Sequence, residues 1–182
     1  KGIVTMKSGA TETAIMNYNM ITEEMIFEKG GTRLAMANIE TIDTVYLDSR
    51  KFIPHENVFY EVLIRNNISL FKRHRCNLLK AGAPAAYGGT SETSATTSIS
   101  VLISSGSMYK LELPNEYRVR DASLYLITIN GAESRIAGER QFLKLFPDKS
   151  EELADYIKEN KLDIRKDEDL KILIIKCNEL WY

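Results

Sequence analysis

The stretch ENVFYEVLIRNNISLFKRHRC, residues 56–76, decides the fold of this chain. Its first half alternates between a wholly apolar set of positions and a set that mixes apolar and charged residues. The apolar set is Val58, Tyr60, Val62 and Ile64, and the mixed set is Phe59, Glu61, Leu63 and Arg65. Alternation with period 2, rich in β-branched and aromatic residues, is typical of a half-buried strand. Asn66 and Asn67 tolerate positive φ angles and predict a tight two-residue turn before a second strand resumes at Ile68.

Similar short segments, separated by turn residues, precede and follow this hairpin. The sequence predicts strands at 2–6, 13–18, 24–28, 33–37, 44–47, 51–53, 98–104, 108–113, 123–129 and 133–137. Gly30-Gly31 and Asn130-Gly131 supply the positive φ angles that hairpin turns need. Pro54 has no N–H to donate, so we expect it to end the strand before the central hairpin.

After Gly138 the apolar spacing becomes helical. Gln141, Phe142, Leu145 and Phe146 predict a short helix that Pro147 ends or interrupts. Asp148 and Glu151 form a possible capping box for a second helix, which Asn160 would terminate. The last helix would begin at an acidic turn and bury one apolar stripe. The turn is Asp167, Glu168 and Asp169, and the stripe is Leu170, Leu173, Ile174 and Cys177.

These elements predict an α+β, mainly antiparallel β protein of about a dozen strands followed by two or three helices. The short connections favour hairpins and meanders rather than crossover helices. So many strands cannot form one flat sheet, so we expect a rolled sheet, as a barrel, half-barrel or sandwich. The chain is predicted to be one domain, residues 1–182, with a β part at 1–137 and a helical part at 138–182.

Composition limits the classes of function. The chain is 44% hydrophobic and 27% charged, which is typical of a globular protein. Its net charge of −1 provides no general attraction for nucleic acid, and we expect no nucleic-acid partner. No apolar run approaches the ~18 residues that span a bilayer. The two cysteines, Cys76 and Cys177, allow one disulfide at most; two buried free thiols are favoured, and a bridge is the alternative.

Few residues suggest chemistry. Glu61 faces away from the apolar stripe and would have a raised pKa if that second face is also enclosed.

Two arginines, Arg73 and Arg75, are weak candidates for contacts with an anion, because they are predicted to share one face of a strand. The plainer interpretation is an edge strand that its charges protect from aggregation. His74 and Cys76 could share a face, but zinc needs three or four ligands, so we predict no metal and no cofactor. No hydrolase motif occurs, and we predict no enzymatic activity.

Residues 81–100 are poor in large apolar side chains, and eight of the eleven residues at 90–100 are Ser or Thr. Such a segment buries little to offset its ordering entropy. A mobile or surface loop is favoured, with a lid over a ligand as the alternative. Tyr87, followed by Gly88-Gly89, is a weak ligand-binding candidate in this loop, because the segment lacks the lysine of a phosphate-binding loop.

Several segments together resemble uncharacterised secreted or periplasmic proteins of Bacteroides-type bacteria, a domain of unknown function. They are Gly2-Ile3-Val4, Tyr60-Glu61-Val62-Leu63, Leu70, Tyr87-Gly88 and, most specifically, Phe142-Leu143-Lys144-Leu145-Phe146-Pro147. The resemblance covers most of the chain and implies export, with a mature N-terminus near Lys1, but it transfers no catalytic residue. The β-plus-helix plan is also similar to half-barrel lipoprotein carriers, by architecture alone.

The sequence therefore predicts a non-enzymatic binding or interaction module outside the cytoplasm, periplasmic or secreted, that uses the mouth of a curved sheet. Its partner would be an unknown small molecule, a glycan or a protein. Membrane anchoring through a segment upstream of Lys1 is compatible with this prediction. The alternatives are a carrier of lipid or another apolar ligand, with the strand at 58–64 lining its cavity, and an enzyme whose site is assembled from distant residues.

Overall fold

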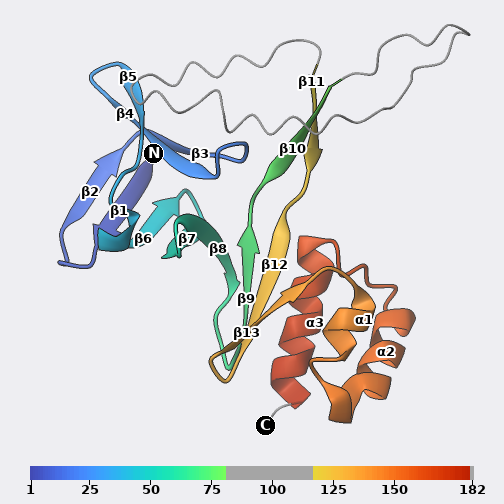
Figure 1. Cartoon of the computed structure of the whole chain (residues 1–182). Helices are drawn as coiled ribbons and strands as arrows, with labels where there is room; N and C mark the ends of the chain where they lie inside the picture. The colour runs from blue at the N-terminus through green and yellow to red at the C-terminus, as the bar shows by residue number, and fades with distance from the viewer. Residues whose placement is uncertain (81–116, 181–182) are drawn as a thin grey trace, which may run out of the picture. The chain divides into compact units, whose positions relative to one another are not determined.

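The computed structural model describes residues 1–80 and 117–180. These residues form thirteen strands and three α-helices, and the strand pairs are antiparallel (Figure 1). This confirms the predicted fold class of mainly antiparallel β structure followed by C-terminal helices. The loop predicted at 81–100, with Tyr87, and the strands predicted at 98–104 and 108–113 lie outside the described residues.

The chain divides into two compact units, each made of two segments. The first unit is Lys1–Phe59 with His74–Ser123, and the second is Tyr60–Arg73 with Leu124–Tyr182. In neither unit do the described strands close into a barrel. The assignment of residues 1–182 to a single domain remains a prediction.

The first unit contains an antiparallel row of four strands in the order β2 (Thr11–Ala14), β1 (Gly2–Met6), β6 (Ile42–Leu47) and β7 (Arg50–His55). Alternate residues of these strands face a core with other apolar residues of the unit. That core consists of Val4, Met25, Ile42, Val45, Leu47, Phe52 and Phe59.

Strand β7 corrects one prediction, because it continues through Pro54 to His55. The residues of β7 that pair with β6 are Arg50 to Phe52. Pro54 lies beyond them, so no β6 partner requires its missing N–H.

A second sheet of the first unit consists of β3 (Met16–Asn19), β4 (Glu24–Lys29) and β5 (Thr32–Ala35). The Gly30-Gly31 turn between β4 and β5 has φ angles of 60° and 77°, as predicted. The single strand predicted at 13–18 is wrong, since it divides at Ile15 into β2 and β3, which belong to different sheets. The division follows from the side chains: β2 has no apolar face, whereas Met16 and Tyr18 of β3 pack against the core.

Two further strands of this unit, β10 (Cys76–Lys80) and β11 (Tyr117–Asp121), pair with each other and with no other described strand (Figure 1). We call this pair the β10–β11 ribbon. The backbone N–H of Cys76 donates to the carbonyl oxygen of Met20, 3.0 Å away, so the base of the ribbon is tied to the loop after β3.

In the second unit, β8 (Val58–Ile64) continues from the first unit and is followed in the sheet by β9 (Ile68–Arg73), β12 (Leu124–Ile129) and β13 (Ala132–Ile136). The central hairpin is therefore confirmed as β8 and β9. Its turn is not the predicted one: three residues separate the strands, and neither Asn66 nor Asn67 has a positive φ. The Ser69 hydroxyl closes the turn instead, since it donates to the Asn66 carbonyl oxygen at 2.7 Å and accepts from the Asn66 N–H at 3.2 Å.

The helical part comprises α1 (Glu139–Leu143), a 3₁₀ turn (Pro147–Lys149), α2 (Ser150–Glu159) and α3 (Asp167–Leu180), all in the second unit (Figure 1). The predicted apolar stripe of α3 is buried, and α2 ends at Asn160, as predicted. The predicted capping box of Asp148 and Glu151 is wrong. Pro147 draws Asp148 into the 3₁₀ turn, so α2 begins at Ser150, without a side-chain cap.

Candidate functional site

The four residues singled out in the sequence do not form one site. Glu61 lies in β8 and Arg73 ends β9, both in the second unit, whereas Arg75 belongs to the first unit. Arg73 and Arg75 were predicted to share one strand face, and this is wrong, because β9 ends at Arg73 and the next strand begins at Cys76. Tyr87 lies outside the described residues.

Arg75 lies next to the carboxylate of Glu23. Its Nε is 4.0 Å from Glu23 Oε1, and that Nε is buried without a hydrogen bond in the described structure. The side chain is 38% exposed. Arg75 is thus held beside Glu23 at the base of the β10–β11 ribbon.

Glu61 belongs to a polar row across strands β8, β9 and β12 of the second unit. Glu61 of β8, Lys72 of β9 and Tyr125 of β12 are register partners, so their side chains share one face. Both Glu61 and Lys72 are buried, which agrees with the expectation of an enclosed second face on β8.

The first turn of α3 completes this row with a carboxylate. Lys72 Nζ donates to both oxygens of Asp167, at 2.7 and 2.8 Å, and the Tyr125 hydroxyl donates to Asp167 Oδ1. The Lys72 ammonium also lies 5.5 Å from the centroid of the Tyr125 ring. Lys72 and Asp167 neutralise each other, and together with Tyr125 they fix the start of α3 to the sheet, so these three residues have a structural role.

The first unit encloses His74 among aromatic rings and a guanidinium. His74 Nε2 lies 2.8 Å from Arg50 Nη2, and the ring centroids of Phe52 and Tyr18 are each 6.1 Å from that of His74. Arginine can only donate, so His74 Nε2 accepts and its proton resides on Nδ1. That lone pair is therefore engaged by Arg50 rather than offered to a metal.

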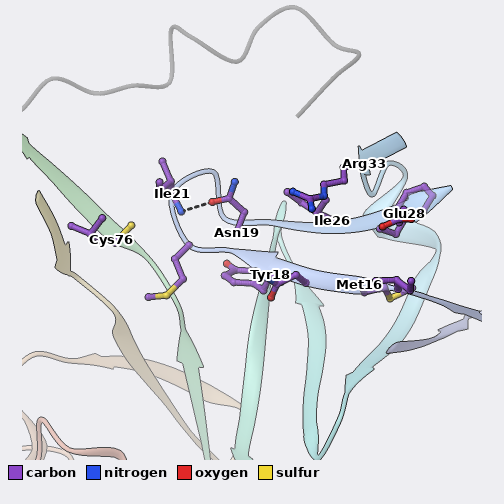
Figure 2. Close-up of a pocket in the computed structure, with 13 residues that line it drawn as sticks. Met16, Tyr18, Asn19, Ile21, Ile26, Glu28, Arg33 and Cys76 are labelled. Atoms are coloured by element: carbon purple, nitrogen blue, oxygen red, sulfur yellow. Dashed lines mark hydrogen bonds between the residues drawn. The ribbon is translucent and has the colours of Figure 1, made fainter. Parts of the chain in front are cut away.

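A cleft in the first unit has a different character. Its volume is about 630 Å³, and it lies between the β3–β4–β5 sheet and the base of the β10–β11 ribbon (Figure 2). We call it the sheet cleft. One face of the sheet contributes Asn17, Asn19, Ile26, Glu28 and Arg33. The other lining residues are Ile15, Met16, Tyr18, Met20, Ile21, Phe27, Cys76 and Val119.

Strand register explains why polar groups gather in the sheet cleft. Asn17 pairs with Ile26, Asn19 with Glu24 and Glu28 with Arg33, so these side chains share one face of the sheet. The opposite face carries residues that pack toward the core. In Figure 2, Asn19, Ile26, Arg33 and Glu28 lie on one side of the β3–β4 hairpin, and Tyr18 and Met16 lie on the other.

The asparagines of this face keep donors available. Asn19 Oδ1 accepts from the backbone N–H of Ile21 at 2.9 Å and shapes the turn after β3 (Figure 2). Asn17 Oδ1 accepts from the N–H of Tyr18 at 2.9 Å. Each amide therefore uses its oxygen locally, and each Nδ2 group remains for a ligand.

Charges of both signs flank these amides. Glu28 and Arg33 are exposed and directly opposite each other, and neither side chain forms an ion pair within the described residues. Opposite Asn19, the buried Oε2 of Glu24 has no hydrogen-bond partner in the described part of the chain.

The thiol in the cleft is a weak nucleophile. Burial raises the pKa of Cys76, the carboxylates of Asp121 and Glu23 raise it further, and Arg75 lowers it in part. The thiol is therefore protonated at neutral pH. No histidine is among the described residues that line the sheet cleft.

Sequence reasoning missed this site, although a signal was present. Asparagine is depleted in strands, yet Asn17 and Asn19 occupy alternate positions of one strand beside Met16 and Tyr18. That pattern indicates a strand with one apolar and one hydrogen-bonding face.

Fold and site together define an antiparallel β protein with a C-terminal helical part and a cleft of mixed polar and apolar lining. Comparisons with protein-family models, with curated proteins and with solved structures found no match. No helix in the described residues is long and apolar enough to cross a membrane.

Proposed function

We propose that this protein is a non-enzymatic binding module whose sheet cleft takes a small zwitterionic ligand of the amino-acid or short-peptide class. The observation that carries this proposal is the set of hydrogen-bonding groups on the cleft face that have no partner in the described structure. They are Asn17 Nδ2, Asn19 Nδ2, the Glu28 carboxylate and the Arg33 guanidinium.

The chemistry of the walls selects this ligand class. Glu28 would receive an ammonium group and Arg33 a carboxylate, at directly opposed positions of β4 and β5. The asparagine amides would donate to a peptide carbonyl oxygen. Ile26 and the flanking Ile15 and Ile21 would hold an apolar side chain. A volume of about 630 Å³ is within the usual range for small-molecule sites.

The proposed setting is outside the cytoplasm, in the periplasm or secreted. This proposal is supported by the resemblance of several segments, above all 142–147, to exported proteins of Bacteroides-type bacteria. Expression of the gene from its natural start, followed by cell fractionation, tests it. Recovery of the protein only from the cytoplasm would contradict it.

Binding is tested by isothermal titration of the purified chain with a panel of free amino acids and dipeptides, with an oligosaccharide panel and a fluorescent fatty acid in parallel. We expect an apolar amino acid or dipeptide to bind. Arg33→Ala and Glu28→Ala should each weaken that binding by roughly 5- to 30-fold, because each removes a charge-assisted hydrogen bond.

The exposed Arg65 and Glu133 of the second unit offer matched controls, and their substitution by alanine should leave binding unchanged. Tight binding of the fatty acid alone would favour the carrier of apolar ligands. Binding of a dipeptide that the cleft variants do not weaken would remove the sheet cleft from the proposal.

A further inference from the structure

The β10–β11 ribbon has two faces of different chemistry. Cross-strand register places Arg118 opposite Leu79 and Arg120 opposite Asn77 on one face. The other face carries Val119 opposite Leu78. Arg118 and Arg120 are exposed, and neither guanidinium has a partner within the described residues. The first face is therefore a basic strip on a ribbon of only two strands.

Strand β11 also has an open edge. It pairs with β10 on one side, and alternate N–H and C=O groups on its other side have no strand partner among residues 1–80 and 117–180. Val119, between the two arginines, is 57% exposed on the opposite face. An open edge, two unpaired cations and one exposed apolar residue thus lie within three consecutive positions.

We propose that the edge of β11 binds an acidic extended peptide segment of a partner protein by strand addition. An added strand places its side chains directly opposite those of β11, about 5 Å away. Acidic residues at two alternate positions of the peptide would then face Arg118 and Arg120, which are about 7 Å apart along the strand. The residue between them would lie beside Val119 and should be apolar. The preferred pattern is acidic–apolar–acidic.

Charge complementarity decides between a peptide and a nucleic acid. Two arginines can engage two phosphates, whereas nucleic-acid binding needs a broader basic surface, and the net charge of the chain is −1. A peptide uses the same two cations and, in addition, the unpaired main-chain groups of the β11 edge. Neither arginine lines the sheet cleft, whereas Val119 belongs to its wall.

The test uses the full chain and fluorescein-labelled peptides with fluorescence anisotropy. The probe contains Glu-Val-Glu-Val-Glu, and a scrambled control, Glu-Glu-Glu-Val-Val, keeps the composition without the alternation. We expect the alternating peptide to bind at least fivefold more tightly than the control. The double variant Arg118→Glu/Arg120→Glu should lose roughly tenfold or more in affinity, since each exposed ion pair contributes about two- to fivefold.

A charge swap distinguishes recognition from damage to the ribbon. The double variant should bind Lys-Val-Lys-Val-Lys more tightly than the wild type does. Arg135→Glu/Arg140→Glu, at exposed arginines of the second unit, is the matched control and should bind the acidic peptide like the wild type.

Three results would overturn the proposal. Equal affinity for the alternating and scrambled peptides would show attraction without strand register. Tighter binding of a single-stranded oligonucleotide would identify the strip as a phosphate site. Self-association of the double variant with unchanged peptide affinity would show that the arginines only keep this edge from pairing with another copy.

Discussion

The two units of this protein use clusters of polar residues in opposite ways. In the second unit, Lys72, Asp167 and Tyr125 bond to one another. In the first unit, Asn17, Asn19, Glu28 and Arg33 leave donors or charges without partners in the described residues. Polar groups that satisfy one another hold a fold together, whereas polar groups left open on one face of a sheet are available to a ligand.

From this comparison we expect Asp167→Asn to reduce the stability of the protein more than the other variants do. This change leaves the buried Lys72 ammonium without its carboxylate partner in α3 and weakens the bond to Tyr125. Urea unfolding should show a loss of about 3 kcal/mol in unfolding free energy, because in this partly buried pair the buried Lys72 ammonium loses its counter-charge from α3.

Glu168→Gln is its control in the same first turn. Glu168 forms an exposed pair with Lys171, and its removal should cost roughly 0.5 kcal/mol or less. Equal losses for the two variants would mean that the polar row does not support the second unit.

We expect Asn178→Ala to lower the unfolding free energy somewhat less than Asp167→Asn does. The buried Asn178 amide accepts from the N–H of Ile68 and donates to the carbonyl oxygens of Ile68 and Ile174, each at 2.9 Å. Its removal leaves main-chain groups at the start of β9 unsatisfied, which should cost about 2–3 kcal/mol. Hydrogen exchange at Ile68 should accelerate in this variant, and an unchanged exchange rate would contradict the role of Asn178.

The buried thiol of α3 should make stability depend on alkaline pH. Burial raises the pKa of Cys177 from 9.0 to about 12. Between these values the unfolded chain releases the thiol proton while the folded chain retains it, so stability is full below pH 9 and falls as the pH rises towards 12. The unfolding free energy should be measured at pH 8 and at pH 10. Between these two pH values the wild type should lose about 1.4 kcal/mol more than Cys177→Ala loses. If the stability of the wild type and of Cys177→Ala fell equally between pH 8 and pH 10, the Cys177 thiol would not be buried away from solvent.

The smallest stability effects should come from the sheet cleft. Glu28→Ala and Arg33→Ala remove exposed side chains without partners among the described residues, so each should change the unfolding free energy by less than ~0.5 kcal/mol. Thermal melts measure this directly. A loss above 1 kcal/mol would place these residues with the structural polar row and weaken the contrast between the units.

The sequence predicted the elements with local signals. The alternation at 58–64, the Gly30-Gly31 and Asn130-Gly131 turns and the apolar stripe of α3 all appear in the structure, because each depends on neighbouring residues. The turn at Asn66 and the start of α2 were wrong, since the Ser69 hydroxyl and the 3₁₀ turn at Pro147 outweighed the preferred turn and cap residues.

The site was harder to predict than the fold. The sheet cleft depends on which strands become neighbours, and Asn17, Arg33 and Val119 lie far apart in the sequence. Arg73 and Arg75 looked like one cluster only because the strand was assumed to continue through His74. Charge patterns along one segment do not show where a strand ends.

The most direct test of the contrast between the units is nuclear magnetic resonance of the ¹⁵N-labelled protein during titration with the tightest amino acid or dipeptide of the panel. The account predicts shifts of the Asn17 and Asn19 side-chain amides and of the Glu28 and Arg33 backbone signals, with Lys72 and Tyr125 unchanged. Shifts centred on Lys72, Tyr125 and Asp167, with the cleft signals unmoved, would contradict it.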